Sequence, residues 1–317
     1  MVICKMNESC LVCNSTDLST VRSYRGDSKL FRNLELKKCN NCTFVFADPL
    51  PKDEELDKYN SSYFVNAHGG LSSHPMATAY QAAINKVRAN YVIEKIQKEK
   101  DLNLKILEIG PGTGDFFKFW LQRFPNSEYS ILESDLINRE RFKGLVNFQY
   151  SSFKEIPSNY FDLIVISHVL EHTNDPKRFL NELSSNLKNV GFMFIEVPCQ
   201  DYLFKDKEEP HLLFFNKESI NQLFNRINMH VVNLGYFGPS ITQSFSKKIL
   251  NRVYLKIVSF FLKFRITLPV SLFFPKMRNY LSNLEILMIL PSEAIRENQT
   301  RLGGSEQLFL KISKQSE

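Results

Sequence analysis

The sequence contains little tryptophan and no long uninterrupted hydrophobic segment. One Trp stands against 27 Phe and 12 Tyr in 317 residues, and hydrophobic residues make up 43% of the chain. This composition excludes a disordered, collagen-like or coiled-coil protein. The first residues, Met1–Asn7, lack the apolar core of a secretory signal peptide. The longest uncharged run of the most apolar stretch, Ile266–Pro275, is about half of what spans a bilayer. We therefore expect a cytoplasmic protein that neither leaves the cell nor crosses a membrane.

Positive charge is concentrated in one segment. Residues 241–280 carry eight basic side chains and no acidic one, whereas acids slightly outnumber bases in the rest of the chain. This distribution argues against a protein that coats nucleic acid and for one local positive face. Apolar residues of the same segment recur at helical spacing. It could be a helix packed on the domain, or a basic amphipathic helix that contacts an anionic membrane or a phosphorylated substrate.

Four of the six cysteines form two pairs with the spacing of metal ligands. Each pair is separated by two residues, and the pairs are 25 residues apart: Cys10 and Cys13, then Cys39 and Cys42. Two such knuckles complete a tetrahedral zinc site. Disulfides are disfavoured in the cytosol, where we expect this chain. With all four positions filled by protein, the zinc would be structural and would stabilise a segment too small to bury its own core.

From residue 104 onward, apolar strands alternate with helical segments. The expected strands are 105–109, 129–132, 161–167, 192–197, 229–236 and 307–313. Asp175 and Pro176 form an N-cap followed by proline at the first helical position, which predicts a helix to about Leu187. This alternation predicts an α/β fold with a doubly wound parallel sheet, whose ligand binds at the carboxyl ends of the strands.

The chain therefore divides into five expected parts. A zinc ribbon covers residues 1–52, and a helical linker and lid covers 53–103, with a polar loop over 60–73. The cofactor-binding core covers 104–240. A basic helical insert over 241–300 precedes the last strand of the core and the tail, 301–317.

A glycine-rich loop after the first core strand indicates the ligand. Its spacing, Gly110-x-Gly112-x-Gly114, differs from the G-x-G-x-x-G pattern of dinucleotide sites. Glu108 precedes the loop and suits a ligand with an ammonium group. Glu133 ends the next strand, where a carboxylate accepts hydrogen bonds from ribose hydroxyls. The pattern favours S-adenosylmethionine over NAD, and a degenerate dinucleotide site is the alternative.

The sequence resembles a known family at these positions. Leu107–Gly114 is similar to the first motif of class I S-adenosylmethionine-dependent methyltransferases, and Ser167–Pro176 resembles their HVLEHxxDP segment. Cys10–Pro51 resembles the zinc-binding module of bacterial sugar methyltransferases, including C-methyltransferases of deoxysugar pathways. The resemblance implies a seven-stranded Rossmann-like methyltransferase sheet with a small zinc ribbon in front and a helical insert before the last strand.

The resemblance also implies roles for individual residues. The three glycines of the loop would let it pass close to the cofactor, Glu108 would meet the amino group and Glu133 the ribose. Ser152 and Phe153 occupy the position near the adenine, where Phe153 could stack on the base. The resemblance places Ser167 and His168 beside the methionine part, although His168 could equally be structural.

Two histidines are candidates for acid–base chemistry. His211 lies in Glu208–Ser219, which resembles the family's EHxxYFS segment, whose histidine faces the substrate; it could instead cap the next helix. His172, the second candidate, could be structural. Pro210, Phe214 and Asn216 depart from the family pattern, which favours O-methylation over C- or N-methylation.

The expected acceptor is a small molecule, in particular a nucleotide- or lipid-linked sugar of glycan biosynthesis. We expect no nucleic acid partner, and a contact with the inner face of an anionic membrane follows only if the basic insert is amphipathic. A methyltransferase for a quinone or lipid precursor is one alternative. A non-catalytic scaffold with the same fold is another.

Overall fold

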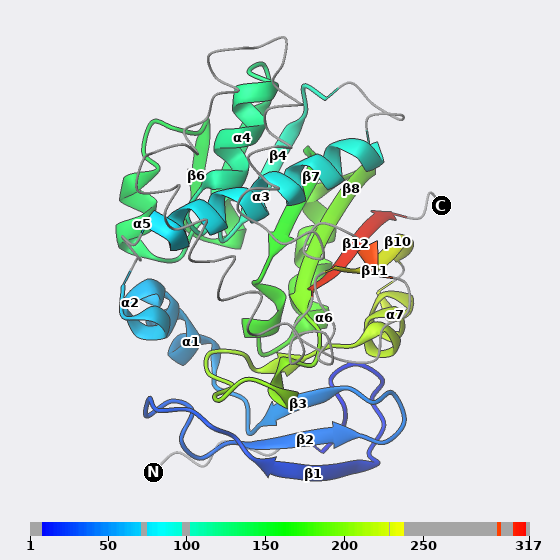
Figure 1. Ribbon diagram of the computed structural model, residues 1–317. Coiled ribbons are helices and arrows are strands. Elements are labelled where there is room, and N and C mark those ends of the chain that lie inside the picture. The colour runs from blue at the N-terminus through cyan, green and yellow to red at the C-terminus, as the bar shows by residue number, and fades with distance from the viewer. Residues whose placement is uncertain are drawn as a thin grey trace.

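The computed structural model describes residues 8–70, 75–96, 102–227, 229–237, 297–298 and 307–314. These residues form two sheets. A small antiparallel sheet of four strands lies below a large mixed sheet of eight strands in the view of Figure 1. The predicted α/β fold with a central parallel sheet is confirmed.

The large sheet has the strand order β11-β10-β12-β8-β7-β4-β5-β6. Neighbouring strands from β8 to β6 are parallel, and β12 is antiparallel to both β8 and β10. Six of these strands lie where the sequence pattern predicts them; β6 completes the seven that the family resemblance implies, and the two-residue strand β11 is an eighth. The strands are β4 (Lys105–Ile109), β5 (Glu128–Leu132), β6 (Phe148–Tyr150), β7 (Phe161–Ser167), β8 (Leu187–Pro198), β10 (Met229–Phe237), β11 (Glu297–Asn298) and β12 (Gln307–Lys314).

Helices cover both faces of this sheet because strand side chains alternate between the two faces. Ile106 and Val165 pack with residues of α3 and α4, whereas Leu107 and Ile164 pack on the other face with α6, α7 and the small sheet. The helices are α3 (Pro75–Ile96), α4 (Asp115–Arg123), α5 (Leu136–Arg141), α6 (Pro176–Asn186) and α7 (Lys217–Arg226), with short 3₁₀ turns η1 (Phe153–Glu155), η2 (Leu170–His172) and η3 (Asp201–Leu203).

Local capping explains where two of these helices begin. The Asp175 side chain accepts a hydrogen bond from the Arg178 amide at 3.0 Å, and Pro176 takes the first helical position, as the sequence predicts. Asn216 caps α7 in the same way by accepting from the Ser219 amide at 2.8 Å.

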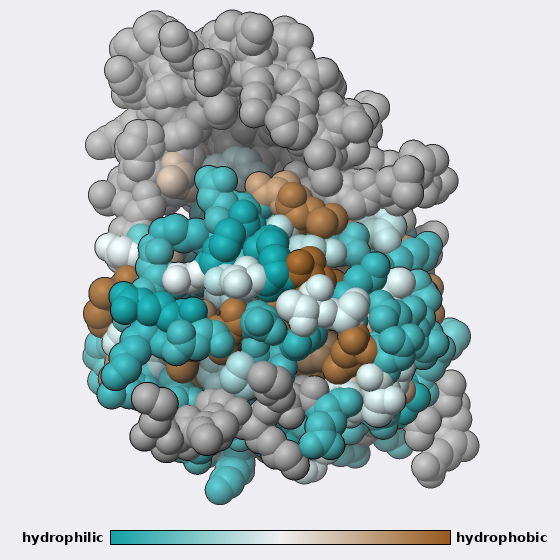
Figure 2. All heavy atoms as spheres, turned by 90° about the horizontal axis from the view of Figure 1, so that it is seen from below, coloured by the Kyte–Doolittle hydropathy of each residue, from teal (hydrophilic) through white to brown (hydrophobic). Residues whose placement is uncertain are grey.

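The N-terminal ribbon contributes three strands to the small sheet, β1 (Leu18–Ser23), β2 (Glu35–Cys39) and β3 (Val45–Asp48). The fourth, β9 (Leu213–Phe214), comes from the core region, far along the chain. Phe44 of the ribbon packs on Phe215 with ring centroids 5.0 Å apart, and both are fully buried. Ribbon and core therefore share one hydrophobic interior. Figure 2 views the molecule from the ribbon side, where the surface of the described residues is mostly hydrophilic with scattered hydrophobic side chains.

Two short helices connect the ribbon to α3. The first, α1 (Asp53–Asn60), lies in the expected position. The second, α2 (Tyr63–His68), corrects the expectation of a loop over 60–73, because residues 63–68 are helical and Gly69 ends the helix with a left-handed φ of 67°. The Phe64 amide donates to the Asp135 carboxylate at 3.1 Å, which docks α2 at the start of α5.

The basic insert lies outside the described residues, apart from the two residues of β11. The helix expected there, either packed on the domain or in contact with an anionic membrane or phosphorylated substrate, therefore stays a prediction. In the part of the chain that the structure describes, no helix is both long enough and apolar enough to cross a bilayer.

Candidate active site

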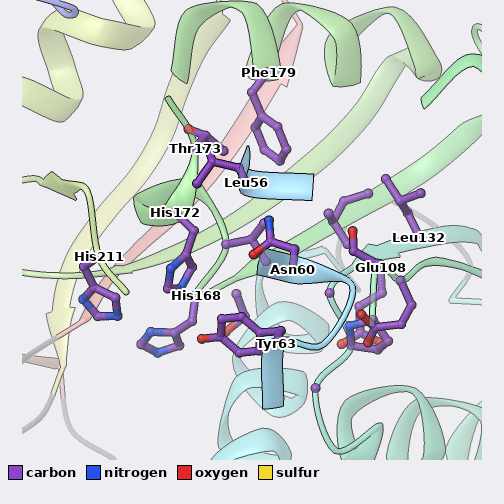
Figure 3. Close-up of a pocket in the computed structure, with 18 of the residues that line it drawn as sticks. Leu56, Asn60, Tyr63, Glu108, Leu132, His168, His172, Thr173, Phe179 and His211 are labelled. Carbon is purple, nitrogen blue, oxygen red and sulfur yellow. The ribbon is translucent and has the colours of Figure 1, made fainter. Parts of the chain in front are cut away.

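A large cavity lies at the carboxyl ends of β4, β5 and β7, where a doubly wound sheet binds its ligands. Its volume is about 1750 Å³, more than one drug-sized ligand needs. Residues of α1, α2 and α3 close it opposite the sheet. Figure 3 shows Glu108 and Leu132 at one end, the histidines at the other, and Tyr63 between them. The cavity therefore extends from Glu108 to the histidines, with Tyr63 between the two ends.

The glycine loop forms part of the cavity wall. Gly110 and Gly112 line it with left-handed φ values of 60° and 59°, a conformation that favours glycine. A Cβ at Gly112 would meet no atom of the described residues within 4 Å. Gly114 differs, because it does not line the cavity and a Cβ there would lie 2.5 Å from Phe117. Gly112 thus leaves room for a ligand, while Gly114 serves the packing of α4.

Both predicted carboxylates line the cavity and are almost fully buried. Glu108 accepts a hydrogen bond from the Tyr129 hydroxyl at 2.9 Å, and burial raises its pKa to about 8. Glu133 accepts from the Asp135 amide at 2.9 Å and from the Asn138 side chain at 2.8 Å, and burial also raises its pKa. A bound ammonium group or ribose hydroxyls would supply the polar partners that these buried oxygens favour.

Asn138 connects the glycine loop to Glu133, a link that the sequence did not indicate. Its side-chain amide donates both to the Gly112 carbonyl at 2.6 Å and to the Glu133 carboxylate. Asn138 is fully buried, and its own backbone amide donates to Asp135 at 3.0 Å. The loop and the carboxylate are therefore held in one fixed relation before any ligand arrives.

The other residues predicted for the cofactor also line the cavity. Ser152 and Phe153 lie beside each other on its wall, and the Phe153 ring packs edge-on against Phe179 with centroids 5.5 Å apart. Ser167 donates from its hydroxyl to Glu196 at 3.1 Å. His168 contacts the same Glu196 through Nε2 at 3.3 Å.

A group of paired charged residues near the histidine end of the cavity was not predicted from the sequence. Arg88 of α3 pairs with the fully buried Glu196 of β8, with Nη2 2.9 Å from the carboxylate. His168 lies between Glu196 and Glu171, whose oxygen is 3.2 Å from its Nδ1. Burial alone would lower the pKa of His168, but the two carboxylates outweigh it and raise the pKa to about 9. His168 is therefore a cation at neutral pH.

The two histidines predicted for acid–base chemistry meet at the far end of the cavity. The rings of His172 and His211 lie edge to face with centroids 4.9 Å apart. Nδ1 of His211 is 2.7 Å from the Asp201 carboxylate, and Nε2 is 3.9 Å from Glu171. Lys205 Nζ lies 2.6 Å from the Asp201 carboxylate and 3.4 Å from Nδ1 of His211. The tautomer that donates from Nδ1 to Asp201 is the one that keeps an electron pair on Nε2. Asp201 was not expected from the sequence, since nothing local pairs it with a residue ten positions away.

His172 and Tyr63 complete this end. Nδ1 of His172 lies 3.2 Å from the Pro210 carbonyl, and its Nε2 has no hydrogen-bond partner among the described residues. Burial lowers the pKa of His172 to about 4, so its ring is neutral. The Tyr63 ring packs edge-on against it, and burial raises the Tyr63 pKa. The nitrogens of the two histidines and a Glu171 oxygen lie within 4.8 Å, a group that could also hold a metal ion.

The four ribbon cysteines converge at one point. Cys10 and Cys42 have their sulfurs 3.5 Å apart, those of Cys13 and Cys39 are 3.4 Å apart, and all four lie within 4.8 Å of one another. All four are buried free thiols. Tetrahedral Zn–S bonds of about 2.3 Å place the sulfurs about 3.8 Å apart, so the group fits zinc.

Comparison with known proteins identifies the family. Residues 76–234, half of the chain, match the family model described as a methyltransferase domain. The chain belongs to this family. It is a class I S-adenosylmethionine-dependent methyltransferase with the fold described above.

Individual relatives are distant. The methyltransferase is 30% identical over 167 residues to an uncharacterized protein of Methanocaldococcus jannaschii, and the match covers 51% of this chain and 71% of that protein. It is 28% identical over 120 residues to a ubiquinone biosynthesis O-methyltransferase of Rickettsia bellii, with 35% of this chain and 50% of that enzyme covered. The alignment thus spans half the length of that enzyme.

Among the solved structures that match this chain is a Burkholderia thailandensis 1,6-didemethyltoxoflavin-N1-methyltransferase with bound 1,6-didemethyltoxoflavin and S-adenosylhomocysteine. It is 13% identical, with a TM-score of 0.47, and the match covers 87% of this chain and 98% of that one.

Proposed function

We propose that this methyltransferase methylates a hydroxyl group of a sugar or sugar nucleotide, with His211 as the general base. The observation that supports this proposal best is the cavity itself, which has the buried carboxylates Glu108 and Glu133 at one end and the His211–Asp201 pair at the other. The sugar is favoured by the resemblance of the ribbon to the zinc module of sugar methyltransferases.

The roles of the chain's own residues follow from the geometry. When bound, S-adenosylmethionine supplies an electrophilic methyl group. Glu108 would hold its ammonium group and Glu133 its ribose, while Gly112 leaves the space that it fills. At the other end, Nε2 of His211 would accept the proton of the acceptor hydroxyl as the oxygen gains the methyl group; the bond from this methyl group to sulfur would break, with S-adenosylhomocysteine as the leaving group. Asp201 stabilises the resulting imidazolium, and the enclosing helices limit the access of water.

The proposal is tested by turnover with labelled S-adenosylmethionine. The acceptor panel should contain nucleotide-linked sugars, lipid-linked glycans and hydroxylated quinone precursors. Label transferred to a sugar hydroxyl supports the proposal. Transfer only to a quinone precursor, which similarity to the ubiquinone enzymes favours, would replace it. Absence of transfer to every acceptor, together with absence of cofactor binding, would indicate a scaffold.

Replacing Glu133 tests the cofactor end. Glu133→Ala should weaken S-adenosylmethionine binding by roughly 1.5–3 kcal/mol, because it removes charge-assisted hydrogen bonds to the ribose. Glu133→Gln keeps the size of the side chain and one acceptor oxygen, so this variant should lose less affinity for S-adenosylmethionine than Glu133→Ala. Isothermal titration calorimetry gives the affinities, with Glu140→Ala as control, since Glu140 is exposed and outside the cavity. Wild-type affinity in Glu133→Ala would remove this residue from the site.

The cysteine group leads to a prediction on metal content. The protein purified without chelator should contain about one zinc per chain. Cys39→Ser should lower the zinc content and destabilise the ribbon, while cofactor binding largely persists, because no described residue of the ribbon lines the cavity. Cys199→Ser is the control, because Cys199 is a buried cysteine outside the group. Metal analysis that finds no zinc in the wild-type protein would contradict the assignment.

A further inference from the structure

The segment that carries His211 is held by the ribbon as well as by the core. β9, which begins two residues after His211, pairs with β3 through Val45 and Phe46. The Leu212 carbonyl accepts from the Ala47 amide at 2.8 Å, while the Leu212 amide donates to the Glu171 carbonyl of the core, also at 2.8 Å. The backbone next to His211 therefore bridges the two parts of the molecule.

A buried carboxylate fastens the other side of the same segment. The Glu208 side chain is 0% exposed and pairs with Arg22 at 2.9 Å and with Arg25 at 2.5 Å. Its backbone amide donates to the Arg25 carbonyl at 3.0 Å, and its carbonyl accepts from the His211 amide at 2.8 Å. A buried carboxylate that loses its cationic partners is strongly destabilised. This contact therefore favours a single arrangement of the segment that carries His211 on the ribbon.

Tyr24 makes the most direct contact. Its hydroxyl donates to the His211 carbonyl at 2.8 Å, and both residues are buried. Burial, with Glu208 nearby, raises the pKa of Tyr24, so the hydroxyl keeps its proton and stays a donor. Tyr24 directly follows β1, whose other end pairs Leu18 with the cysteine Cys39. One strand thus runs from the cysteine group to the residue that contacts His211.

We propose that the ribbon positions the general base, with Tyr24 and the Arg22–Arg25–Glu208 group as positioning residues for His211. None of these side chains lines the cavity, so they act through His211 and not on a ligand. The consequence for catalysis rests on the proposed function, in which His211 is the base. The orientation of the ring is independent of that assignment and can be observed in the protein alone.

The first experiment observes the ring directly. The imidazole nitrogens of the six histidines are recorded by NMR in protein with nitrogen-15-labelled histidine, and the His211 signals are assigned by their loss in His211→Gln. In Tyr24→Phe, which removes one oxygen and no packing, the His211 signals should shift or broaden. Glu208→Gln should shift them further. Zinc content and affinity for S-adenosylhomocysteine, measured on the same samples, should stay at wild-type values in Tyr24→Phe.

Tyr160→Phe is the matched control. Its hydroxyl donates to the Glu128 carboxylate at 2.7 Å, and Tyr160 does not line the cavity. The substitution removes a similar hydrogen bond and should leave the His211 signals unchanged. The inference is overturned if Tyr24→Phe and Glu208→Gln both give wild-type His211 signals, or if Tyr160→Phe disturbs them equally.

The second experiment uses turnover with the acceptor that the sugar panel identifies. Tyr24→Phe should lower kcat by about 2- to 10-fold, the scale of one hydrogen bond, without raising the KM for S-adenosylmethionine. In the His211→Ala background the same substitution should have no further effect. If His211→Ala lowers kcat and Tyr24→Phe lowers it further by the same factor in the double variant, the positioning role of Tyr24 is overturned but His211 stays the base. If His211→Ala keeps full activity, the assignment of His211 as the base is overturned, whatever the NMR result.

Discussion

A Gly112→Val variant is expected to lose measurable binding of S-adenosylmethionine. Gly112 has a φ of 59°, which a β-branched residue rarely adopts, and the space beyond its Cα is open cavity. Valine would place its methyl groups where the cofactor must lie. Calorimetry with S-adenosylmethionine should show no heat of binding at concentrations that saturate the wild-type protein.

The control for this variant is Gly144→Val. Gly144 also has a left-handed φ, 76°, and a Cβ there would likewise meet no described atom within 4 Å, but Gly144 does not line the cavity. Both variants carry similar backbone strain, so both should lose similar thermal stability. Only Gly112→Val should lose binding of S-adenosylmethionine. Equal binding in the two variants would show that this loop does not approach the cofactor.

A His211→Ala variant is expected to turn over the acceptor about 10²-fold more slowly or worse, the usual scale for a positioned acid–base residue. Its affinity for S-adenosylhomocysteine should be nearly unchanged, because His211 lies at the opposite end of the cavity from Glu108 and from Leu132, the residue before Glu133 (Figure 3). Initial rates with labelled S-adenosylmethionine measure the effect. Unchanged turnover would leave His172 and Tyr63 as the candidates.

Asp201→Asn refines this prediction. Asparagine keeps the size of the side chain but removes the charge that holds the proton on Nδ1 of His211. Turnover should fall here too, although His211 itself is retained. His230→Ala is the control, because His230 is an exposed residue of β10 and does not line the cavity. Its turnover should equal that of the wild-type protein.

Short-range patterns in the sequence predicted the core well. The N-cap at Asp175 and the glycine loop after β4 depend on residues a few positions apart, so their geometry follows from local chemistry. The alternation of strands and helices identified the parallel sheet for the same reason. Residues placed at strand ends, such as Glu108 and Glu133, reached the cavity because parallel strands share one carboxyl edge.

Contacts between distant segments could not be predicted in this way. Arg88 on α3 meets Glu196 on β8, and neither residue has a sequence neighbour that marks it as paired. Likewise, β9 was not expected in the ribbon sheet, because two residues carry too little periodicity to indicate a strand. The Asp201–His211 pair depends on the path of the chain between β8 and β9. These contacts arise from tertiary packing.

The pairing of β9, a strand of the core region, with the ribbon sheet has a consequence for the order of folding during synthesis. The ribbon leaves the ribosome before the core, whereas Leu213 and Phe214 follow only after most of the core has been translated. Until then, the edge of β3 has open backbone groups, and Phe44 lacks its partner Phe215. The four cysteines all lie within the ribbon, so a metal bound there would hold the three early strands while the nascent chain awaits the fourth.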